Sequence, residues 1–326
     1  MNRFEKQLVQ SLIKNKNVWE VISDNDLDLL NFLEINKNNK KLKIDRDKLK
    51  IIRKINNFNC PNCDGRGLII DPFFKDILNK FEEIIKNRPK AIPQYDQAFI
   101  KPEDVVRRVE FIHERGDLLN SKILVIGDDD LISIVLGLTK LPKIIYVVEI
   151  DQRITSFINN IAKKFNIKVK SLKYDVRTSL PKNLLSKFDV FITDPVETEK
   201  GLKIFLLRGM LSLKQGGSGY FGLTTLESSL KKWYKIEKFI LNNGFVITDI
   251  KRKFSVYPIT KDENSWMSFK EKLPIYNKLK DKNNYDWYTS SFIRIEKIKI
   301  AKIKNKRITI GKFFYIDPEA LATPRI

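Results

Sequence analysis

The feature that most constrains this chain is an apolar, strand-like run that ends in one glycine and three consecutive carboxylates. The run is Ile123–Ile126, and Gly127, Asp128, Asp129 and Asp130 follow it. Three adjacent carboxylates repel one another unless a cation or hydrogen-bond donors compensate. In dinucleotide-binding folds the same turn is glycine-rich and holds phosphate on bare backbone N–H groups. Carboxylates there would repel a pyrophosphate, so we expect a nucleoside without phosphate, or a ligand with positive charge.

A second apolar run carries acids at the spacing of a nucleoside-binding fold. Residues 143–148 are mostly apolar, and Glu149 and Asp151 close the run. Glu149 lies about 20 residues after Gly127, the interval at which such folds place the acid that binds the ribose hydroxyls. Helical spacing follows over 154–165. We therefore expect Glu149, with Asp151 beside it, to bind a ribose.

Two further strands end in acids. A third strand over 167–172 leads to Asp175, where an adenine pocket often lies, and a fourth over 188–193 runs into Asp194 and Glu197. The recurrence of strand, acid and helix predicts an α/β fold with a doubly wound, Rossmann-like parallel sheet and ligands across its carboxyl edge. Downstream we predict helices over 203–213 and 226–242, a flexible glycine turn over 216–219, and strands over 220–224, 245–250 and 291–295.

The order of these signals resembles the S-adenosylmethionine-dependent methyltransferases and the aminopropyltransferases that share their fold. The closer resemblance is to the branched-chain polyamine synthases. Their marks include a Gly-Asp-Asp-Asp turn (127–130), a Tyr-Asp-Gln element (95–97) and an Asp-Pro-x-Glu turn (194–197). The first and last are specific in combination, and the similarity of layout covers nearly the whole chain.

The resemblance implies an aminopropyltransferase. Such an enzyme moves aminopropyl groups from decarboxylated S-adenosylmethionine, a co-substrate, to the secondary amine of spermidine. The products are N4-aminopropylspermidine, then N4-bis(aminopropyl)spermidine, and methylthioadenosine. No prosthetic group and no metal are expected.

The chemistry of this reaction suits the acidic residues. Both reactants are cations, and carboxylates can bring them together despite their repulsion. The attacking amine must also lose a proton. We expect Asp129 nearest the reacting nitrogen as catalytic residue, Asp130 second, and Asp128 turned towards the donor. The remaining assignments are Gly127, Glu149, Asp151 and Asp175 on the donor, Asp194 and Glu197 on the acceptor's other amines, and Tyr95, Asp96 and Gln97 closing the site.

Each motif also has a purely structural interpretation. The aspartates can form a solvated turn and helix N-cap, and Glu149 and Asp151 can be ordinary strand-end residues. Asp194 followed by proline can be only a helix start, and residues 95–97 only a loop. Two functional alternatives also stay open, namely a methyltransferase acting on RNA or DNA and a DNA-binding regulator that senses a nucleoside or polyamine. Base-methylating enzymes typically have an aromatic residue after the Asp-Pro-Pro of the fourth-strand turn. Glu197 at this place favours an amine.

The net charge of +21 raises the question of a nucleic-acid partner. Lysine, asparagine and isoleucine are abundant along the entire chain, which indicates a global bias, compatible with adaptation to heat. We therefore expect small-molecule partners rather than nucleic acid. No run of apolar residues is long enough to span a membrane and no signal peptide is evident, which predicts a cytoplasmic protein. We also expect a homodimer.

Three parts of the chain are predicted: a winged-helix-like N-terminal domain over 1–88, a catalytic domain over 89–300 and a flexible basic tail over 301–326. The first part has short helices over 4–12, 18–22 and 27–35, and alternating apolar residues over 41–55. It can serve packing, dimerisation or DNA binding. Cys60 and Cys63 can form a reduced turn, a disulfide, or half of a zinc site shared by two protomers, because the chain has two cysteines and one histidine.

Overall fold

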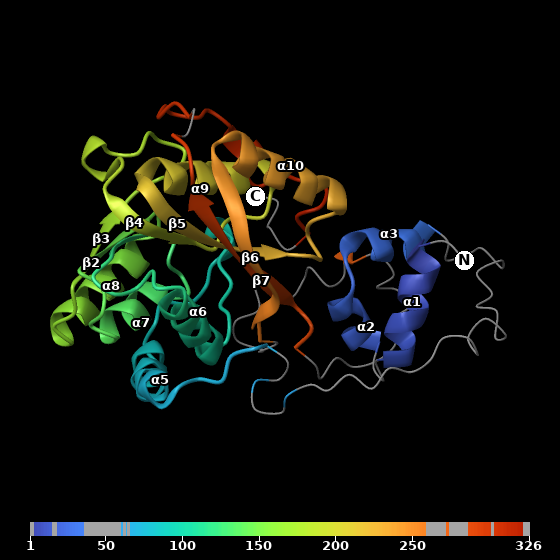
Figure 1. Ribbon diagram of the computed structural model, residues 1–326, viewed down its shortest axis with the longest axis horizontal. Helices are drawn as coiled ribbons and strands as arrows, with labels where there is room; N and C mark the ends of the chain where they lie inside the picture. The colour runs from blue at the N-terminus through green and yellow to red at the C-terminus, as the bar shows by residue number, and fades with distance from the viewer. Residues whose placement is uncertain are drawn as a thin grey trace.

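A seven-stranded sheet with the strand order β3-β2-β1-β4-β5-β7-β6 forms the centre of the protein (Figure 1). The computed structural model describes residues 3–14, 18–35, 60, 63, 66–258, 272–273, 286–300 and 303–321. The strands are β1 Lys122–Ile126, β2 Ile144–Glu149, β3 Val169–Lys173, β4 Phe188–Thr193, β5 Leu213–Thr224, β6 Phe245–Val256 and β7 Thr289–Lys297.

The predicted α/β, Rossmann-like class is confirmed, although the sheet is mixed rather than wholly parallel. β1 pairs in parallel with β2 and β4, and further parallel pairs join β2 to β3 and β4 to β5. β7 lies antiparallel to both β5 and β6. The period of apolar residues along a strand does not encode its direction, because direction depends on the connection that precedes it. The sequence pattern therefore located β7 without giving its orientation.

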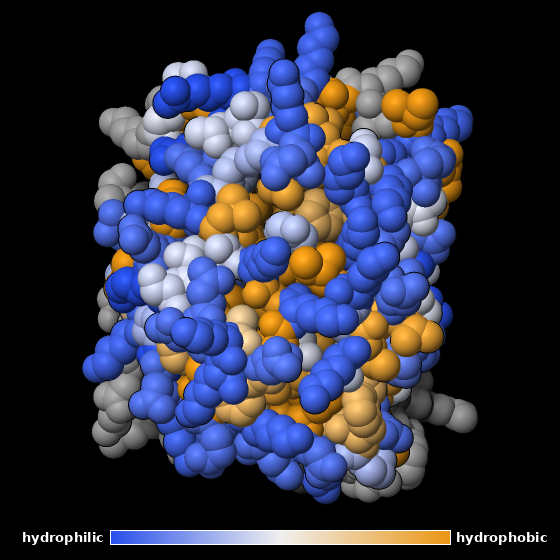
Figure 2. Space-filling model, turned by 90° about the vertical axis from the view of Figure 1, so that its left-hand side faces the viewer, coloured by the Kyte–Doolittle hydropathy of each residue, from blue (hydrophilic) through white to orange (hydrophobic). Residues whose placement is uncertain are grey.

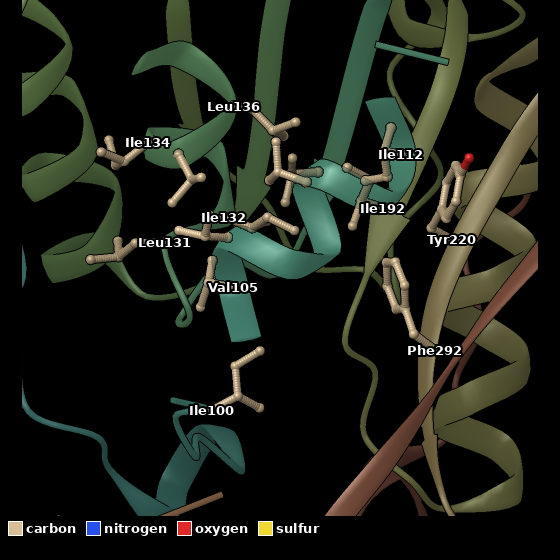
Figure 3. Packing of buried hydrophobic residues seen from close by; sticks show 14 of the residues in the cluster. Ile100, Val105, Ile112, Leu131, Ile132, Ile134, Leu136, Ile192, Tyr220 and Phe292 are labelled. Carbon is tan, nitrogen blue, oxygen red and sulfur yellow. The ribbon is translucent and has the colours of Figure 1, made fainter. Parts of the chain in front are cut away.

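Helices cover both faces of the sheet (Figure 1). Alternate residues of β1 belong to different layers, with Ile123 and Val125 in one apolar cluster and Leu124 and Ile126 in the other. The first layer contains α5 Pro72–Ile85, α6 Pro102–Glu114, α7 Ile132–Leu138 and α8 Gln152–Lys164, and the second contains α9 Glu199–Ser212 and α10 Leu230–Asn242. Figure 3 shows part of the first layer, including Val105 and Ile112 of α6, Ile132 and Leu136 of α7, Ile192 of β4 and Phe292 of β7.

The glycine-rich segment 216–219, predicted as a flexible turn, is instead part of β5. A Cβ atom on Gly219 would stand 2.2 Å from Cε1 of Phe191, and one on Gly217 would stand 2.9 Å from the carbonyl oxygen of Asp189. Gly209 of α9 meets the same ring from the helix side, at 2.4 Å from Cδ2. Gly209 and Gly219 are therefore required by close packing around Phe191, and Gly217 by the close approach of the β4 backbone.

The three N-terminal helices form where they were predicted, as α1 Arg3–Lys14, α2 Val18–Asp24 and α3 Leu27–Ile35. They contact the catalytic part of the chain: the rings of Trp19 and Trp287 lie 5.1 Å apart between centroids. The Leu27 N–H donates to the carbonyl of Thr225 at 3.1 Å. The predicted alternating segment 41–55 lies outside the described residues, so the winged-helix character and the domain boundaries stay predictions.

The described part of the C-terminal segment packs against the ends of two helices. The Glu199 N–H of α9 donates to Asp317 at 2.7 Å, and the Ser229 N–H at the start of α10 donates to Glu319 at 2.9 Å. Phe314 is buried, and its carbonyl accepts a hydrogen bond from the Thr198 hydroxyl at 2.7 Å. Residues 314–319 are thus anchored to the catalytic part of the chain.

Polar side chains are spread over the face seen in Figure 2, with apolar side chains between them, rather than gathered into one stripe.

Among the helices that the structure describes, none is both long and apolar enough to cross a bilayer. Cys60 and Cys63, both described, are not joined by a disulfide.

We expect Gly219→Ala to destabilise the protein by about 1–3 kcal/mol, the usual effect of overpacking a dense core. Guanidinium unfolding followed by circular dichroism measures the change. The double variant Gly219→Ala/Phe191→Leu, which shrinks the opposing ring, should lose less stability than the sum of its single changes. Equal stability of Gly219→Ala and the wild type would show that the segment is the flexible turn first predicted.

Candidate active site

A cavity lies at the carboxyl edge of the sheet, where β1, β2, β3 and β4 end. Most of the residues predicted from the sequence line it. They are Tyr95, Asp96, Gln97, Gly127, Asp129, Glu149, Asp175, Asp194 and Glu197. Asp128 and Asp130 instead line a smaller cavity behind the first, which Asp129 and Asp194 also border. The structure therefore brings together residues that are up to about a hundred positions apart in the sequence.

The three consecutive aspartates do not share one environment. Asp129 borders both cavities, and its Oδ2 accepts a hydrogen bond from the Ala98 N–H at 3.2 Å. Asp130 is buried, and its Oδ1 accepts from the Ile100 N–H at 2.8 Å. The segment that precedes α6 thus supplies backbone donors to two of the carboxylates. Both donors are neutral amides, so they stabilise the charges without neutralising them.

One side of the cavity is organised around Glu149. Its two carboxylate oxygens accept hydrogen bonds from the N–H groups of Asp128 and Asp151, each at 2.8 Å. Asp151 is the N-cap of α8 through the Arg153 N–H, and it also accepts from the Gln97 side chain at 3.1 Å. Asp151 therefore lies behind Glu149 and links it to Gln97. The role of each residue towards a nucleoside stays a prediction.

Aromatic side chains line the part of the cavity near Asp175. Phe205, Phe314 and Tyr315 all border it, and the rings of Phe205 and Phe314 stack with centroids 6.3 Å apart. Asp175 forms an ion pair with Arg177 at 2.7 Å. Burial alone would raise the pKa of Asp175, but the hydrogen bonds from Arg177 outweigh it and lower that pKa. An apolar aromatic wall beside an acceptor of N–H groups suits a purine ring.

The opposite side of the cavity is also acidic. Glu197 accepts two hydrogen bonds from Thr224, one from its N–H and one from its hydroxyl, both at 2.7 Å. Asp194 accepts from the hydroxyl of Tyr257 at 3.2 Å and from Arg108 at 2.8 Å. Glu227 lines this side as well. Several carboxylates along one wall suit a ligand that carries several amines.

Burial changes the acidity of these carboxylates. It raises the pKa of Asp129 well above the usual range, and the charges of Asp130, Glu149 and Asp194 add to the increase. Burial also raises the pKa of Asp130 to about 7, although Arg108 opposes the change. The pKa of Glu197 is likewise raised by burial to about 7, against the hydrogen bonds from Thr224. Of the consecutive aspartates, Asp129 borders the main cavity, which places its carboxyl group to exchange a proton with a ligand there.

Sequence reasoning missed several residues of this site, among them Arg108, Glu227, Tyr257, Tyr288 and the aromatic residues Phe205 and Phe314. Arg108 had a signal, because it lies on the apolar stripe of α6 that includes Val105 and is itself buried. A charged residue on such a stripe needs a buried partner. The other three polar residues lie next to strands but belong to no recognisable motif: Glu227 follows β5, Tyr257 follows β6 and Tyr288 precedes β7. Only the fold brings them to the cavity.

The geometry defines a class of enzyme. The sheet order, the Gly127 turn and an acidic cavity at the carboxyl edge are those of a nucleoside-dependent transferase of the methyltransferase and aminopropyltransferase type.

Comparison with known proteins then identifies the family. The sequence model of the branched-chain polyamine synthase A C-terminal domain matches residues 76–322. The chain therefore belongs to the branched-chain polyamine synthases, as the resemblance predicted. The N(4)-bis(aminopropyl)spermidine synthases of Thermococcus kodakarensis and Methanocaldococcus jannaschii are 42% and 40% identical to it, over 82% and 81% of this chain and 75% of each relative.

A solved structure shows the same architecture. The branched-chain polyamine synthase from Thermus thermophilus, in complex with N4-aminopropylspermidine and 5'-methylthioadenosine, has a TM-score of 0.80 to this chain at 29% identity. The match covers 98% of this chain and 92% of that one. The likeness therefore extends over the N-terminal helices as well as the sheet.

We expect Asp129→Asn to raise the melting temperature of the ligand-free protein at pH 8 by roughly 2 °C or more. Because the pKa of Asp129 is raised, its ionised form opposes folding. This cost is absent below the pKa of an unfolded aspartate, about 3.9, and grows as pH rises through the raised value. Scanning fluorimetry at pH 5 and pH 8 should therefore show a difference between variant and wild type that widens with pH.

Asp189→Asn is the matched control. Asp189 accepts from Lys214 at 2.7 Å and from the Lys122 N–H at 2.8 Å. Burial alone would raise the pKa of Asp189, but these hydrogen bonds and the charges of the two lysines outweigh it and lower that pKa. The control should lower the melting temperature at pH 8. A loss of stability in Asp129→Asn as well would contradict the raised pKa.

Proposed function

We propose that the protein transfers aminopropyl groups from decarboxylated S-adenosylmethionine to the secondary amine of spermidine. The observation that carries the proposal is the position of Asp129 between two differently built walls of one cavity. Glu149 and the aromatic residues near Asp175 form a wall that suits a nucleoside. Asp194, Glu197 and Glu227 form a wall that suits a polyamine. The Thermus thermophilus relative supports this reading, since its complex holds N4-aminopropylspermidine and 5'-methylthioadenosine.

The reaction follows from these positions. The lone pair of the secondary amine attacks the aminopropyl carbon that is bonded to the sulfonium sulfur. The C–S bond breaks with its electron pair going to sulfur, which becomes the neutral thioether of methylthioadenosine. The nitrogen becomes a tertiary ammonium, and its proton passes to the ionised carboxylate of Asp129, which borders the cavity between the two walls. Spermidine has a single secondary amine, so the second aminopropyl group is added to the same nitrogen. The lone pair of the tertiary amine attacks a second donor in the same way, the C–S bond breaks towards sulfur, and the quaternary ammonium that forms has no proton to lose.

The choice of donor rests on charge. S-adenosylmethionine itself carries a carboxylate, which would approach residues 128–130 and be repelled by them. The decarboxylated donor lacks this group and presents only cations to the cavity. Spermidine likewise presents only amines. The cytoplasmic location and the homodimeric state stay predictions from the sequence.

Incubation with decarboxylated S-adenosylmethionine and spermidine, followed by mass spectrometry, tests the proposal. We expect successive mass gains of one and two aminopropyl units on spermidine, with release of methylthioadenosine. Asp129→Asn should lower kcat by about 10²–10⁴-fold, the usual contribution of a general base. Asp189→Asn, far from the cavity, is the control and should keep its turnover. Methyl transfer to RNA or DNA from S-adenosylmethionine, with no gain on spermidine, would replace the proposal by the methyltransferase alternative.

Acceptor binding should also depend on pH. The pKa of Glu197 is about 7, so its carboxylate is mostly neutral at pH 6 and mostly ionised at pH 8. The primary amines of spermidine resemble that of lysine, with a pKa near 10.4, and stay charged over this range. Calorimetric titration should therefore show tighter spermidine binding at pH 8 than at pH 6. Glu197→Gln should reduce this difference, and an unchanged difference would remove Glu197 from the acceptor side.

A further inference from the structure

Arg108 lies among the aspartates that line the smaller cavity of the site. Arg108 of α6 is buried, and its Nη1 donates to Asp194 at 2.8 Å and lies 3.7 Å from Oδ2 of Asp130. A cation beside a binding site for cationic ligands would oppose binding unless it had another task. The position of Arg108 therefore calls for an explanation.

The other contacts of Arg108 fix its guanidinium in place. Nε donates to the hydroxyl of Ser255 at 2.8 Å, and Nη2 donates to the hydroxyl of Ser290 at 3.1 Å. The guanidinium carbon also lies 4.9 Å from the centre of the Phe292 ring. Helix α6 is thus tied to β6, to β7 and to the turns after β1 and β4. A group held by four side chains cannot turn towards a ligand without losing these bonds.

Asp194 is held from two sides by this arrangement. Its Oδ2 accepts from both Arg108 and Tyr257, while a Cβ atom on Gly222 would stand 2.0 Å from its Oδ1. The carboxylate therefore has one oxygen engaged by donors and the other packed onto the backbone of β5. Asp129, in contrast, accepts a hydrogen bond from the Ala98 N–H and borders the main cavity.

We propose that Arg108 is a positioning residue that fixes Asp194 and offsets one negative charge of the carboxylate group formed by Asp129, Asp130 and Asp194. With that charge offset, the group holds fewer protons at neutral pH than it would without the guanidinium, and Asp129 is the member that borders the main cavity and, when ionised, takes the proton of the acceptor. This inference rests on the proposed aminopropyl transfer. The three carboxylates are close enough to titrate as one unit, so loss of the guanidinium would make the unit hold more protons near neutral pH.

Other charged and titratable groups surround this unit and also affect the titration of its three carboxylates. Buried Tyr257 follows β6, and Arg88 precedes the 3₁₀ turn Pro93–Tyr95. The groups that face the unit are Arg88, Asp128, Glu149, Glu197 and Tyr257. Arg88 is a further cation in this set, and Arg108 donates a hydrogen bond to Asp194, a member of the unit.

The first test is independent of catalysis. Burial raises the pKa of Asp130 to about 7 even with Arg108 present, so removing the guanidinium should raise the pKa values of the unit further. Raised pKa values make stability fall as pH increases. The melting temperature of Arg108→Gln should therefore fall below that of the wild type by a margin that grows from pH 5 to pH 9. Arg115→Gln, a change at the exposed end of the same helix, should show no such growth.

The second test is the pH dependence of kcat for aminopropyl transfer. We expect the acidic limb of the Arg108→Gln profile to move to higher pH by about one unit or more, since a neighbouring opposite charge shifts a carboxyl pKa by roughly 1–3 units. Arg108→Lys keeps the positive charge but not the forked geometry of the guanidinium. The acidic limb of its kcat profile should therefore lie between those of Arg108→Gln and the wild type. The KM for the donor should stay near its wild-type value, because Glu149 and Asp175 are unchanged.

Two outcomes would overturn the proposal. A melting-temperature margin that is the same at every pH would show that Arg108 does not act as a counter-charge. A kcat that is reduced equally at every pH would show that its role is structural only. If the wild type transferred no aminopropyl group, the proposed function would fail, and the melting curves would still decide whether Arg108 compensates the carboxylates. Arg108→Lys provides the same comparison if Arg108→Gln does not fold.

Discussion

The constraint on which the rest of this structure depends is the burial of several like charges at one edge of a sheet. Asp128, Asp130 and Glu149 are all buried there, and Asp129 and Asp194 lie among them. Burial favours the neutral form of a carboxyl group, and neighbouring carboxylates favour it further. Backbone N–H donors and the fixed guanidinium of Arg108 limit the resulting loss of stability. The negative charge that they do not compensate is available to a cationic ligand. Ligand binding and stability are therefore coupled in this protein.

The carboxylates of the cavity are held by several short segments that come from different parts of the chain. The Ala98 and Ile100 N–H groups reach the aspartates from the segment before α6, while β5 supplies Gly222 and Thr224 to the other wall. Each carboxylate that is expected to bind an amine thus keeps a defined direction before the ligand arrives. A preorganised acidic wall loses little conformational entropy on binding, which favours both affinity and orientation.

The sequence predicted the sheet and most of the carboxylates that line the cavity, but not the directions of the side chains. Strands β1 to β4 begin and end within about two residues of their predicted bounds, because buried strands that end in acids are a strong local signal. Adjacent residues at a turn cannot all face one cavity, so Asp128 and Asp130 lie behind Asp129, and spacing alone does not tell which one faces forward. Arg108 was missed because an arginine in a helix is usually exposed. The segment 216–219 was misjudged because glycine serves close packing as well as flexibility.

Segments from the N-terminal and the C-terminal parts of the chain both contact the segment that carries Glu227. The Leu27 N–H binds the carbonyl of Thr225, and Asp28 accepts from the Leu230 N–H at 2.6 Å. From the other end, Glu319 binds Ser229 at 2.9 Å. During synthesis on a ribosome, the sheet can assemble as soon as β7 has emerged, but this wall of the cavity gains its last anchors only with residues near 319. A chain cut between Tyr315 and Glu319 would therefore keep the aromatic residues near Asp175 but lack the Glu319 anchor beside Glu227.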